Sequence, residues 1–392
     1  MKIAYGVSSV GLGHARRSLT LARYLRKARS DLEISWFCAE PVISFLKEEG
    51  EKIPSICQQL KTLSSVMEDR VSSGRLRDMS LVARTSSSIA RQNYFLLNKD
   101  LSSYDFLVQD EFVETLLAFM WEKHSTLPVH RAVVTDYLEL DSPSTWNPLS
   151  LIVKLHANRM LSRAYAACNP RIFADEIDSI PESIRNRATQ SFCIVGPILP
   201  DPPSESQSAL KEKILHDHFD IAADDKKLIV VSVGGTAAGK YLVDFFAKRN
   251  EELSQELNCR IIVLLGPRIN QSPLAGIENG SIRFIPFTSD MMGYLKASDC
   301  VVCQAGASTL NEVLAVGTPC VAIPISNHFE QEANARRFAE KYGFVNLRYE
   351  QVSVSSIVAS VNEAILARKH LWVDFSPNVA KAGKLILEAF QI

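Results

Sequence analysis

The chain has 392 residues, which is too long for one ordinary hydrophobic core and indicates two domains. Its composition, 46% hydrophobic and 22% charged, excludes a disordered chain, and its net charge of -1 offers nucleic acid no overall attraction. No apolar run approaches the ~20 residues that cross a bilayer, and the N-terminus does not resemble a secretory signal, so we expect a cytoplasmic protein.

The eight cysteines lie mostly inside apolar runs, where we expect them to be reduced and buried. Cys300 and Cys303 have the spacing of a redox or zinc half-site, but they fall in a predicted strand and no second pair accompanies them. We therefore expect neither a metal nor a cofactor.

Predicted strands and helices alternate along the first half of the chain. Residues 14–30 have the apolar spacing of a helix whose arginines face away from the core, and residues 41–50 form a second helix. Residues 60–100 are rich in Ser, Arg and Lys, and we expect helices or loops there rather than sheet. The apolar runs that predict strands are 2–7, 33–39, 104–110, 131–136 and 192–198.

Residues 199–208, LPDPPSESQS, concentrate Pro and Ser and separate this pattern from a second one. The strands are apolar almost throughout, which is typical of parallel strands covered by helices on both faces. We therefore predict an α/β fold of two Rossmann-like, doubly wound domains, residues 1–200 and 201–370, with a C-terminal helix in 371–392 that packs back toward the first domain. The predicted strands of the second half lie in 227–235, 260–266, 282–287, 300–306, 320–325 and 344–348.

Residues 234–241, GGTAAGKY, match the phosphate-binding loop of P-loop NTPases as far as Lys240. The next residue of that loop is Ser or Thr, whose hydroxyl binds magnesium, whereas this chain has Tyr241. The mismatch argues against an NTPase. Gly235 and Thr236 still form a turn at a helix start, where backbone N–H groups can bind an anion.

Residues 303–312, CQAGASTLNE, follow a predicted buried strand and open a helix. Gly306 permits a sharp turn, and the N–H groups and hydroxyls of Ser308 and Thr309 suit a diphosphate. Glu312, one turn further on, can accept two hydrogen bonds from a ribose diol. A capped helix without any ligand is the alternative.

The next predicted strand ends in a second polar turn. Asn327, His328, Glu330 and Gln331 cluster there before a helix, and their carboxylate and carboxamide groups suit the hydroxyls of a sugar. Two polar turns at one edge of a sheet favour a ligand site over an ordinary solvated loop.

Together these residues resemble glycosyltransferases of the GT-B architecture and family 28, in the branch of the peptidoglycan N-acetylglucosaminyl transferases and diacylglycerol glycosyltransferases. The resemblance implies two domains that face a cleft and a nucleotide-sugar donor, with UDP-sugar favoured. It implies no metal, because helix starts balance the charge of the diphosphate. The donor-binding residues that it implies are Gly11, Gly13, Gly235, Thr236, Phe287, Gly306, Ala307, Ser308, Thr309, Glu312, His328, Glu330 and Gln331.

Residues 10–18, VGLGHARRS, resemble the glycine turn in the first domain of these enzymes. We expect His14 to be the general base that takes a proton from the acceptor hydroxyl, or else a polar anchor on the acceptor side. A base of this kind needs a carboxylate that orients its ring. Asp110, at the end of a predicted strand, is the best candidate, and Asp136 is the second.

Two other functions stay open. Nucleotide-sugar hydrolases of sialic-acid-like sugar pathways resemble this fold and have a similar Gly-x-Gly-His-x-x-Arg turn, in which the histidine activates water. A nucleotide-sugar-binding subunit without catalysis is the second alternative. We prefer the transferase because the hydrolases tend to be shorter, and this first half has room for a larger acceptor surface.

The acceptor is left open as a lipid-linked or small molecule. Residues 149–167 include Lys154, His156, Arg159 and Arg163 and form a basic amphipathic stretch. Peripheral association with an anionic membrane would explain this stretch, and a helix that merely covers a sheet is the alternative.

Overall fold

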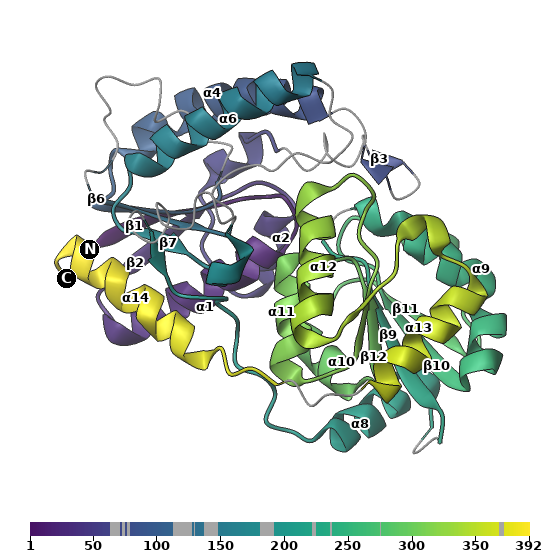
Figure 1. The fold of residues 1–392 in the computed structure, drawn as a ribbon. Helices are drawn as coiled ribbons and strands as arrows, with labels where there is room; N and C mark the ends of the chain where they lie inside the picture. The colour runs from purple at the N-terminus through teal and green to yellow at the C-terminus, as the bar shows by residue number, and fades with distance from the viewer. Residues whose placement is uncertain are drawn as a thin grey trace. The chain divides into compact units, whose positions relative to one another are not determined.

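The computed structural model describes residues 1–62, 71–72, 75–76, 79–112, 128, 130–136, 148–180, 192–221, 225–235, 237–274, 276–367 and 372–392. The chain folds into two compact units (Figure 1). The first unit comprises Met1–Asp69, Asp78–Pro200 and Phe375–Ile392, and the second comprises Arg70–Arg77 and Asp201–Asp374. None of the described helices is long and apolar enough to cross a membrane.

A six-stranded sheet forms the core of the first unit, and all of its strand pairs are parallel. The strand order is β2-β1-β5-β6-β7-β8, so the first strand of the chain lies inside the sheet. Strands β1 and β5 are buried along almost their whole length, as their continuous apolar runs predict. The bounds are β1 Lys2–Val7, β2 Glu33–Phe37, β5 Phe106–Asp110, β6 His130–Thr135, β7 Arg171–Phe173 and β8 Cys193–Ile194.

Helix α1, Gly13–Ala28, follows β1 and buries one face. The apolar spacing predicts this face, and Ala15, Leu19, Ala22 and Leu25 are all buried. The prediction that the arginines face away is wrong for Arg17, whose side chain is buried. The other helices of the unit are α2 Val42–Glu48, α4 Met79–Leu101, α6 Pro148–Ala166 and α14 Ser376–Phe390.

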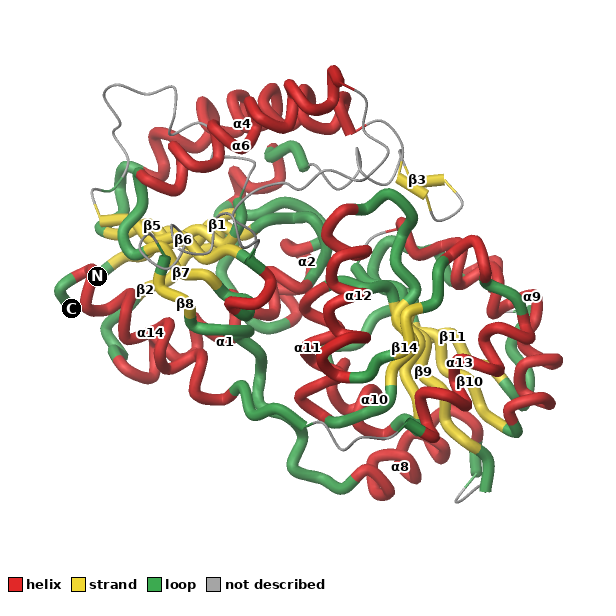
Figure 2. The backbone as a smooth tube through the Cα atoms, in the orientation of Figure 1, coloured by secondary structure: helices red, strands yellow, loops and turns green. Residues whose placement is uncertain are grey.

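The C-terminal helix α14 packs on helix α1 of the first unit (Figures 1 and 2). A side chain at Gly383 would collide with the ring of Tyr24, so this glycine allows the two helices to approach closely. Phe390, at the end of α14, stacks on Phe106 of β5 with 4.6 Å between the ring centroids. The end of the chain therefore belongs to the core of the first unit.

The second unit is built on another six-stranded parallel sheet, in the order β11-β10-β9-β12-β13-β14. Helices α9, Lys240–Leu257, and α13, Val354–Leu366, pack on each other and bury Phe246 and Ile357 against the strands. The strands are β9 Lys227–Ser232, β10 Cys259–Leu264, β11 Ile282–Ile285, β12 Cys300–Cys303, β13 Cys320–Ala322 and β14 Val345–Asn346. The remaining helices are α8 Gln207–Phe219, α10 Met291–Ala297, α11 Ala307–Val316 and α12 Phe329–Tyr342.

Two short segments differ from the prediction. Residues 60–100 contain the long helix α4, but also a two-residue antiparallel pair, β3 Val71–Ser72 with β4 Arg75–Leu76, where no sheet is predicted. Strand β7 has no counterpart among the predicted strands, because its three residues are too few to show a periodic pattern.

Candidate functional site

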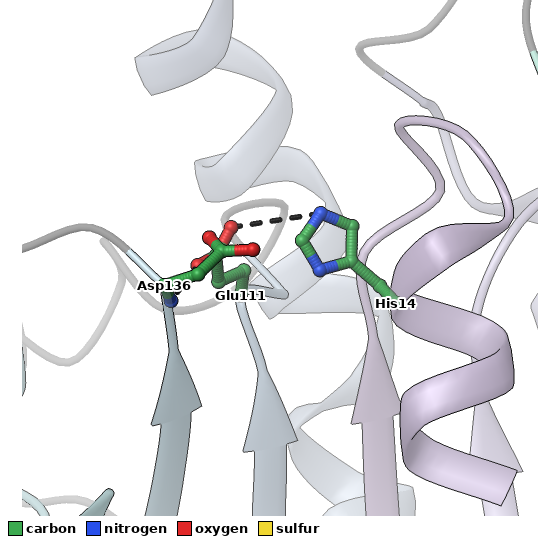
Figure 3. Close-up of side chains that lie close together, drawn as sticks. All are labelled: His14, Glu111 and Asp136. Carbon is green, nitrogen blue, oxygen red and sulfur yellow. Dashed lines mark hydrogen bonds and ion pairs between the residues drawn. The ribbon is translucent and has the colours of Figure 1, made fainter. Parts of the chain in front are cut away.

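The first candidate site lies at the carboxyl edge of the first sheet, where β1, β5 and β6 end side by side (Figure 3). His14 comes from the first turn of α1, Asp110 is the last residue of β5, and Asp136 follows β6. Because parallel strands end at the same edge, these residues meet although they are far apart in the sequence.

The turn between β1 and α1 positions His14. Gly11 has a φ of +80°, in the left-handed region that glycine adopts without strain, and Gly13 is the first residue of the helix. Nδ1 of His14 lies 3.1 Å from Oδ1 of Asp110, and the Asp110 carboxyl is fully buried. Of the two predicted partners, Asp110 is therefore the one that contacts the ring.

Arg17, the arginine of the Gly-x-Gly-His-x-x-Arg turn, joins the two aspartates, a role that the sequence analysis does not give it. Its guanidinium donates to both carboxyl oxygens of Asp110, from Nε at 2.9 Å and from Nη2 at 2.5 Å. Its Nη1 donates to Oδ2 of Asp136 at 3.1 Å. Bidentate pairing of this kind is strong and fixes the geometry of both groups. The sequence does contain a signal, since a residue three positions after His14 lies on the same helix face.

Glu111 is a second residue that the sequence analysis misses. Its Oε1 accepts hydrogen bonds from the Asp136 N–H at 2.7 Å and from the Thr135 hydroxyl at 2.9 Å. Its Oε2 lies 3.6 Å from Nε2 of His14 (Figure 3, dashed line). Glu111 has a φ of +43°, and a positive φ in a residue other than glycine cannot be read from a strand pattern.

Interactions with Arg17 and Asp110 shift the pKa values of Asp110 and His14, respectively. Burial alone raises the pKa of the Asp110 carboxyl, but the charge and hydrogen bonds of Arg17 outweigh it and hold that pKa below its usual value. Burial lowers the pKa of His14, yet the hydrogen bond and charge of Asp110 outweigh this effect and raise it. Asp110 is therefore an ionised partner that favours the protonated form of His14.

Glu111 and Asp136 titrate in opposite directions. Burial, followed by the negative charge of Asp136, raises the pKa of Glu111 well above its usual value. Burial also acts on Asp136, but the charge of Arg17 and a hydrogen bond from Glu111 outweigh it and lower the pKa of Asp136. Within the pair, Glu111 therefore holds a proton to higher pH than Asp136 does.

The hydrogen bonds of His14 assign its tautomer. Nδ1 lies 3.1 Å from Oδ1 of Asp110, an acceptor, and 3.1 Å from Nη2 of Arg17, a donor. This Nη2 already donates to Asp110 at 2.5 Å, and the carboxylate is the stronger influence on the ring. We assign the neutral ring a hydrogen on Nδ1, donated to Asp110, and a lone pair on Nε2.

A metal fits this cluster less well than the arginine does. Within the described part of the chain, His14, Glu111 and Asp136 offer ligand atoms within 4.8 Å of one another. The guanidinium of Arg17 already binds Asp136, however, and the raised pKa of Glu111 disfavours the ionised carboxylate that a divalent cation would bind. Cys300 and Cys303 are buried in β12, and none of the eight cysteines forms a disulfide.

The second candidate site lies at the carboxyl edge of the second sheet, after the neighbouring strands β9 and β12. Gly306 is the N-cap of α11 and Ala307 is its first residue, followed by the half-buried Ser308 and Thr309. A Cβ atom added at Gly306 would meet nothing within 4 Å, and its φ of −70° does not require glycine. The helix start therefore faces open space, as anion binding to its N–H groups requires.

Buried polar atoms that lack a partner gather at this edge. Oγ of Ser232, Nε2 of Gln304 and Oδ1 of Asn311 have no hydrogen-bond partner among the described residues. Such atoms are nearly always satisfied in native proteins, so a bound polar ligand would account for them. The sequence analysis gives Gln304 no role, although its place directly after a buried strand could have revealed it. Glu312, on the same helix as Asn311, is 3% exposed.

At the glycine turn after β9, the backbone lies close to the backbone at Gly266. Gly234 has a φ of +78°, and a side chain at Gly266 would collide with its carbonyl oxygen. Gly235 follows and is half-buried, while the predicted Thr236 lies outside the described residues. Lys240 pairs with Asp244 of its own helix at 2.7 Å in an exposed contact, which agrees with the prediction that this is not a P-loop.

In the turn after β13, side chains that are predicted to bind the sugar form hydrogen bonds to the backbone of the turn. Nδ1 of His328 accepts from the Gln331 N–H at 3.4 Å, and burial lowers the pKa of His328 to about 4, so its ring is neutral. Oε1 of Gln331 accepts from the Ile325 N–H at 3.0 Å, so this side chain too is held by the turn. Glu330 and, in another turn of the unit, Phe287 are half-buried.

Comparison with known proteins assigns the second half of the chain to a family. Residues 228–381 match the glycosyltransferase family 28 C-terminal domain. The chain is 23% identical to an uncharacterized glycosyltransferase of Methanosarcina acetivorans over 365 residues, which are 93% of this chain and 90% of that protein.

Two further proteins resemble this chain, one over less than half of its length and one over almost all of it. The UDP-N-acetylglucosamine--N-acetylmuramyl-(pentapeptide) pyrophosphoryl-undecaprenol N-acetylglucosamine transferase of Caldicellulosiruptor saccharolyticus is 29% identical over 169 residues, 41% of this chain and 45% of that protein. The crystal structure of the glycosyltransferase SnogD from Streptomyces nogalater matches with a TM-score of 0.61 and 16% identity over 99% of both chains, a likeness of fold. Residues 228–381 therefore resemble the C-terminal domain of family 28 glycosyltransferases, and the chain has the GT-B fold.

Proposed function

We propose that this glycosyltransferase moves a hexosyl group from a nucleoside diphosphate sugar to an acceptor hydroxyl, without a metal ion. UDP-sugar is the favoured donor, and the Caldicellulosiruptor relative supports it because its name specifies UDP-N-acetylglucosamine. The acceptor is a lipid-linked or small molecule, the reaction is cytoplasmic, and no nucleic acid takes part.

One observation carries the proposal: Nδ1 of His14 is paired at 3.1 Å with the buried, ionised Asp110. The remaining nitrogen, Nε2, then presents its lone pair to a hydroxyl, and Asp110 stabilises the imidazolium that forms. In the proposed step the acceptor oxygen forms a bond to the anomeric carbon and its proton passes to Nε2. The electron pair of the breaking C–O bond leaves with the nucleoside diphosphate.

The donor half of the proposal rests on the second unit. We assign the diphosphate to the N–H groups at the start of α11, where Gly306 leaves space, and the ribose to Glu312. The sugar hydroxyls are assigned to Gln331 and its neighbours in the turn after β13. The leaving charge is balanced by helix starts, so the proposal includes no metal.

The test is a product assay with UDP-, GDP-, CMP- and dTDP-sugars, each with and without a pool of lipid and small-molecule acceptors. We expect one nucleotide sugar to raise the thermal unfolding midpoint, and turnover that needs an acceptor and survives EDTA. His14→Ala should lower kcat by about 10²–10⁴-fold, whereas the matched control His216→Ala, on an exposed surface, should not. Free sugar released in water alone would identify a hydrolase, and binding without turnover a non-catalytic subunit.

We also propose that helices α4 and α6 rest on an anionic membrane surface. They contact each other and lie side by side (Figures 1 and 2). On α4, the exposed residues Arg91, Phe95 and Lys99 lie at helical spacing and form one row. On α6, the exposed residues Leu155, Arg159 and Arg163 form a second row. Each row therefore places one apolar residue beside two basic ones. The side chains of Lys154 and His156 lie outside the described residues.

A further inference from the structure

Glu111 is the acid nearest to the reactive nitrogen of His14, yet the proposed reaction does not use it. Its Oε2 lies 3.6 Å from Nε2 of His14, and its side chain is only 5% exposed (Figure 3). Its φ of +43° holds the backbone in a region that glutamate rarely adopts. Strain of this kind persists where the surrounding structure imposes it, and functional sites are where it concentrates.

The hydrogen bonds of Glu111 determine which oxygen carries its proton. Oε1 accepts from the Asp136 N–H at 2.7 Å and from the Thr135 hydroxyl at 2.9 Å, so both of its lone pairs are in use. A proton on this carboxyl therefore belongs on Oε2. This is the oxygen that faces Nε2 of His14.

The charged groups around Glu111 favour that proton. The pKa values of Asp110, the residue before it, and of Asp136 are lowered, whereas burial, the charge of Asp136 and a side-chain hydrogen bond with Asp136 raise the pKa of Glu111 well above its usual value. Arg17, from α1, lies 4.0 Å from Oε1, and its charge is already shared between the two aspartates.

Two phenols complete the surroundings. From β1, Tyr5 is buried, and burial raises its pKa, so it carries no charge. From α6, the hydroxyl of Tyr165 lies 3.2 Å from Oγ1 of Thr135, the residue that donates to Glu111. Neither of these two described phenols brings a positive charge to the carboxyl.

We infer that Glu111 binds the acceptor together with His14: the acceptor hydroxyl lies between the two side chains, takes the hydrogen bond that Oε2–H of Glu111 otherwise donates to Asp136, and gives its proton to Nε2 of His14. The inference rests on the proposed function. Two atoms 3.6 Å apart can both reach one oxygen at ~2.8 Å, the ordinary length of such hydrogen bonds. Glu111 keeps its proton throughout, and the acceptor proton ends on the imidazolium.

A neutral Glu111 also keeps His14 able to act as a base. An ionised carboxylate at this distance would pair with the imidazolium and stabilise the protonated ring, which cannot accept a proton. A hydrogen-bond donor without charge holds the hydroxyl and leaves the lone pair of Nε2 available. Glutamine has the same shape and the same lack of charge.

The activity test therefore compares Glu111→Gln with Glu111→Ala. We expect Glu111→Gln to retain kcat/KM for the acceptor within about tenfold, because its amide donates in place of the acid. Glu111→Ala should lose about tenfold to a hundredfold more, since the acceptor oxygen loses a buried partner. Thermal unfolding of both variants checks that they fold, and binding of the nucleotide sugar should be unchanged.

A second measurement needs no substrate. The ring of His14 is titrated by NMR with labelled histidine, and its signal is identified by its loss in His14→Ala. We expect the pKa of His14 to shift by less than about half a unit in Glu111→Gln, because no charge is removed. The inference about the proton can thus be judged even if no transfer is found and the proposed function fails.

Three results would overturn the inference. A His14 pKa that falls by a unit or more in Glu111→Gln means that Glu111 is ionised. Loss of activity in Glu111→Gln as large as in His14→Ala means that Glu111 is itself the base. Full activity in Glu111→Ala means that Glu111 does not hold the acceptor.

Discussion

At the scale of single residues, the edge of the first sheet is a buried network in which each charge depends on its neighbour. Arg17 offsets Asp110 and Asp136, and Asp110 in turn supports the protonated form of His14. Removing one member of a buried ion pair costs more than the pair contributes, because the remaining charge is left without compensation. We therefore expect substitutions in this network to change the stability of the protein as well as its activity.

Asp110→Asn should lower the free energy of unfolding by about 3–5 kcal/mol at neutral pH, because Arg17 loses its bidentate partner. The pKa of Asp110 is lower in the folded state, so its contribution is present above the unfolded pKa of about 3.9 and is lost as the pH falls through the folded value. Urea unfolding at several pH values should therefore show a difference that shrinks in acid. Asp201→Asn, on the exposed surface, is the control, and an equal effect there would contradict the argument.

The sequence predicts part of this network, and the reasons are specific. Asp110 ends a strand and His14 begins the helix that follows the neighbouring strand, so strand patterns and chain order are enough to bring them together. The role of Arg17 is missed because an arginine on a helix is expected at the surface, and its burial depends on two aspartates from other strands. Glu111 is missed because its direction depends on a positive φ that no residue pattern announces.

At the scale of elements, an apolar run predicts a strand even where the strand itself is short. Strands β1 and β9 match their predicted runs and the three-residue β13 lies within the predicted run 320–325, whereas β7, β3 and β4 lie in no apolar run long enough to show a period. Helical spacing is equally informative on the surface. Each of the helices α4 and α6 has a buried face, which includes Leu97 on α4 and Leu161 on α6. The basic residues of the two rows therefore lie at the surface.

The two rows predict binding to vesicles that contain anionic lipid. Phe95 is 69% exposed and Leu155 is 61% exposed, so both can insert apolar surface, while Arg159 and Arg163 attract the headgroups. In co-sedimentation, the double variant Arg159→Glu and Arg163→Glu should weaken binding by about tenfold or more. Each basic residue near an anionic membrane contributes ~1 kcal/mol to binding, and charge reversal adds repulsion to that loss. Leu366→Ser, which changes an apolar residue with 86% exposure on the second unit, should not. Equal binding to neutral vesicles would refute the electrostatic part.

At the scale of the whole molecule, the two units carry different chemistry. The first has an ionised network around a histidine at the end of its sheet, and the second has open space at a helix start beside unsatisfied polar atoms. The proposed reaction assigns activation of the hydroxyl to charged groups and binding of the diphosphate to a helix start, and these make opposite demands on their surroundings. Their separation into two units allows each to be built without disturbing the other.

This division predicts that binding and turnover can be lost independently. Glu312→Ala should weaken binding of the nucleotide sugar by about tenfold to a hundredfold, because the ribose loses a buried carboxylate partner. His14→Ala should leave that affinity unchanged while it abolishes most turnover. Calorimetry with the donor alone and product assays under saturating donor separate the two effects, and Glu212→Gln on exposed α8 is the matched control. If Glu312→Ala bound the donor as tightly as the parent, the assignment of the ribose to α11 would be wrong; if His14→Ala lost donor affinity, His14 would contact the diphosphate rather than the acceptor.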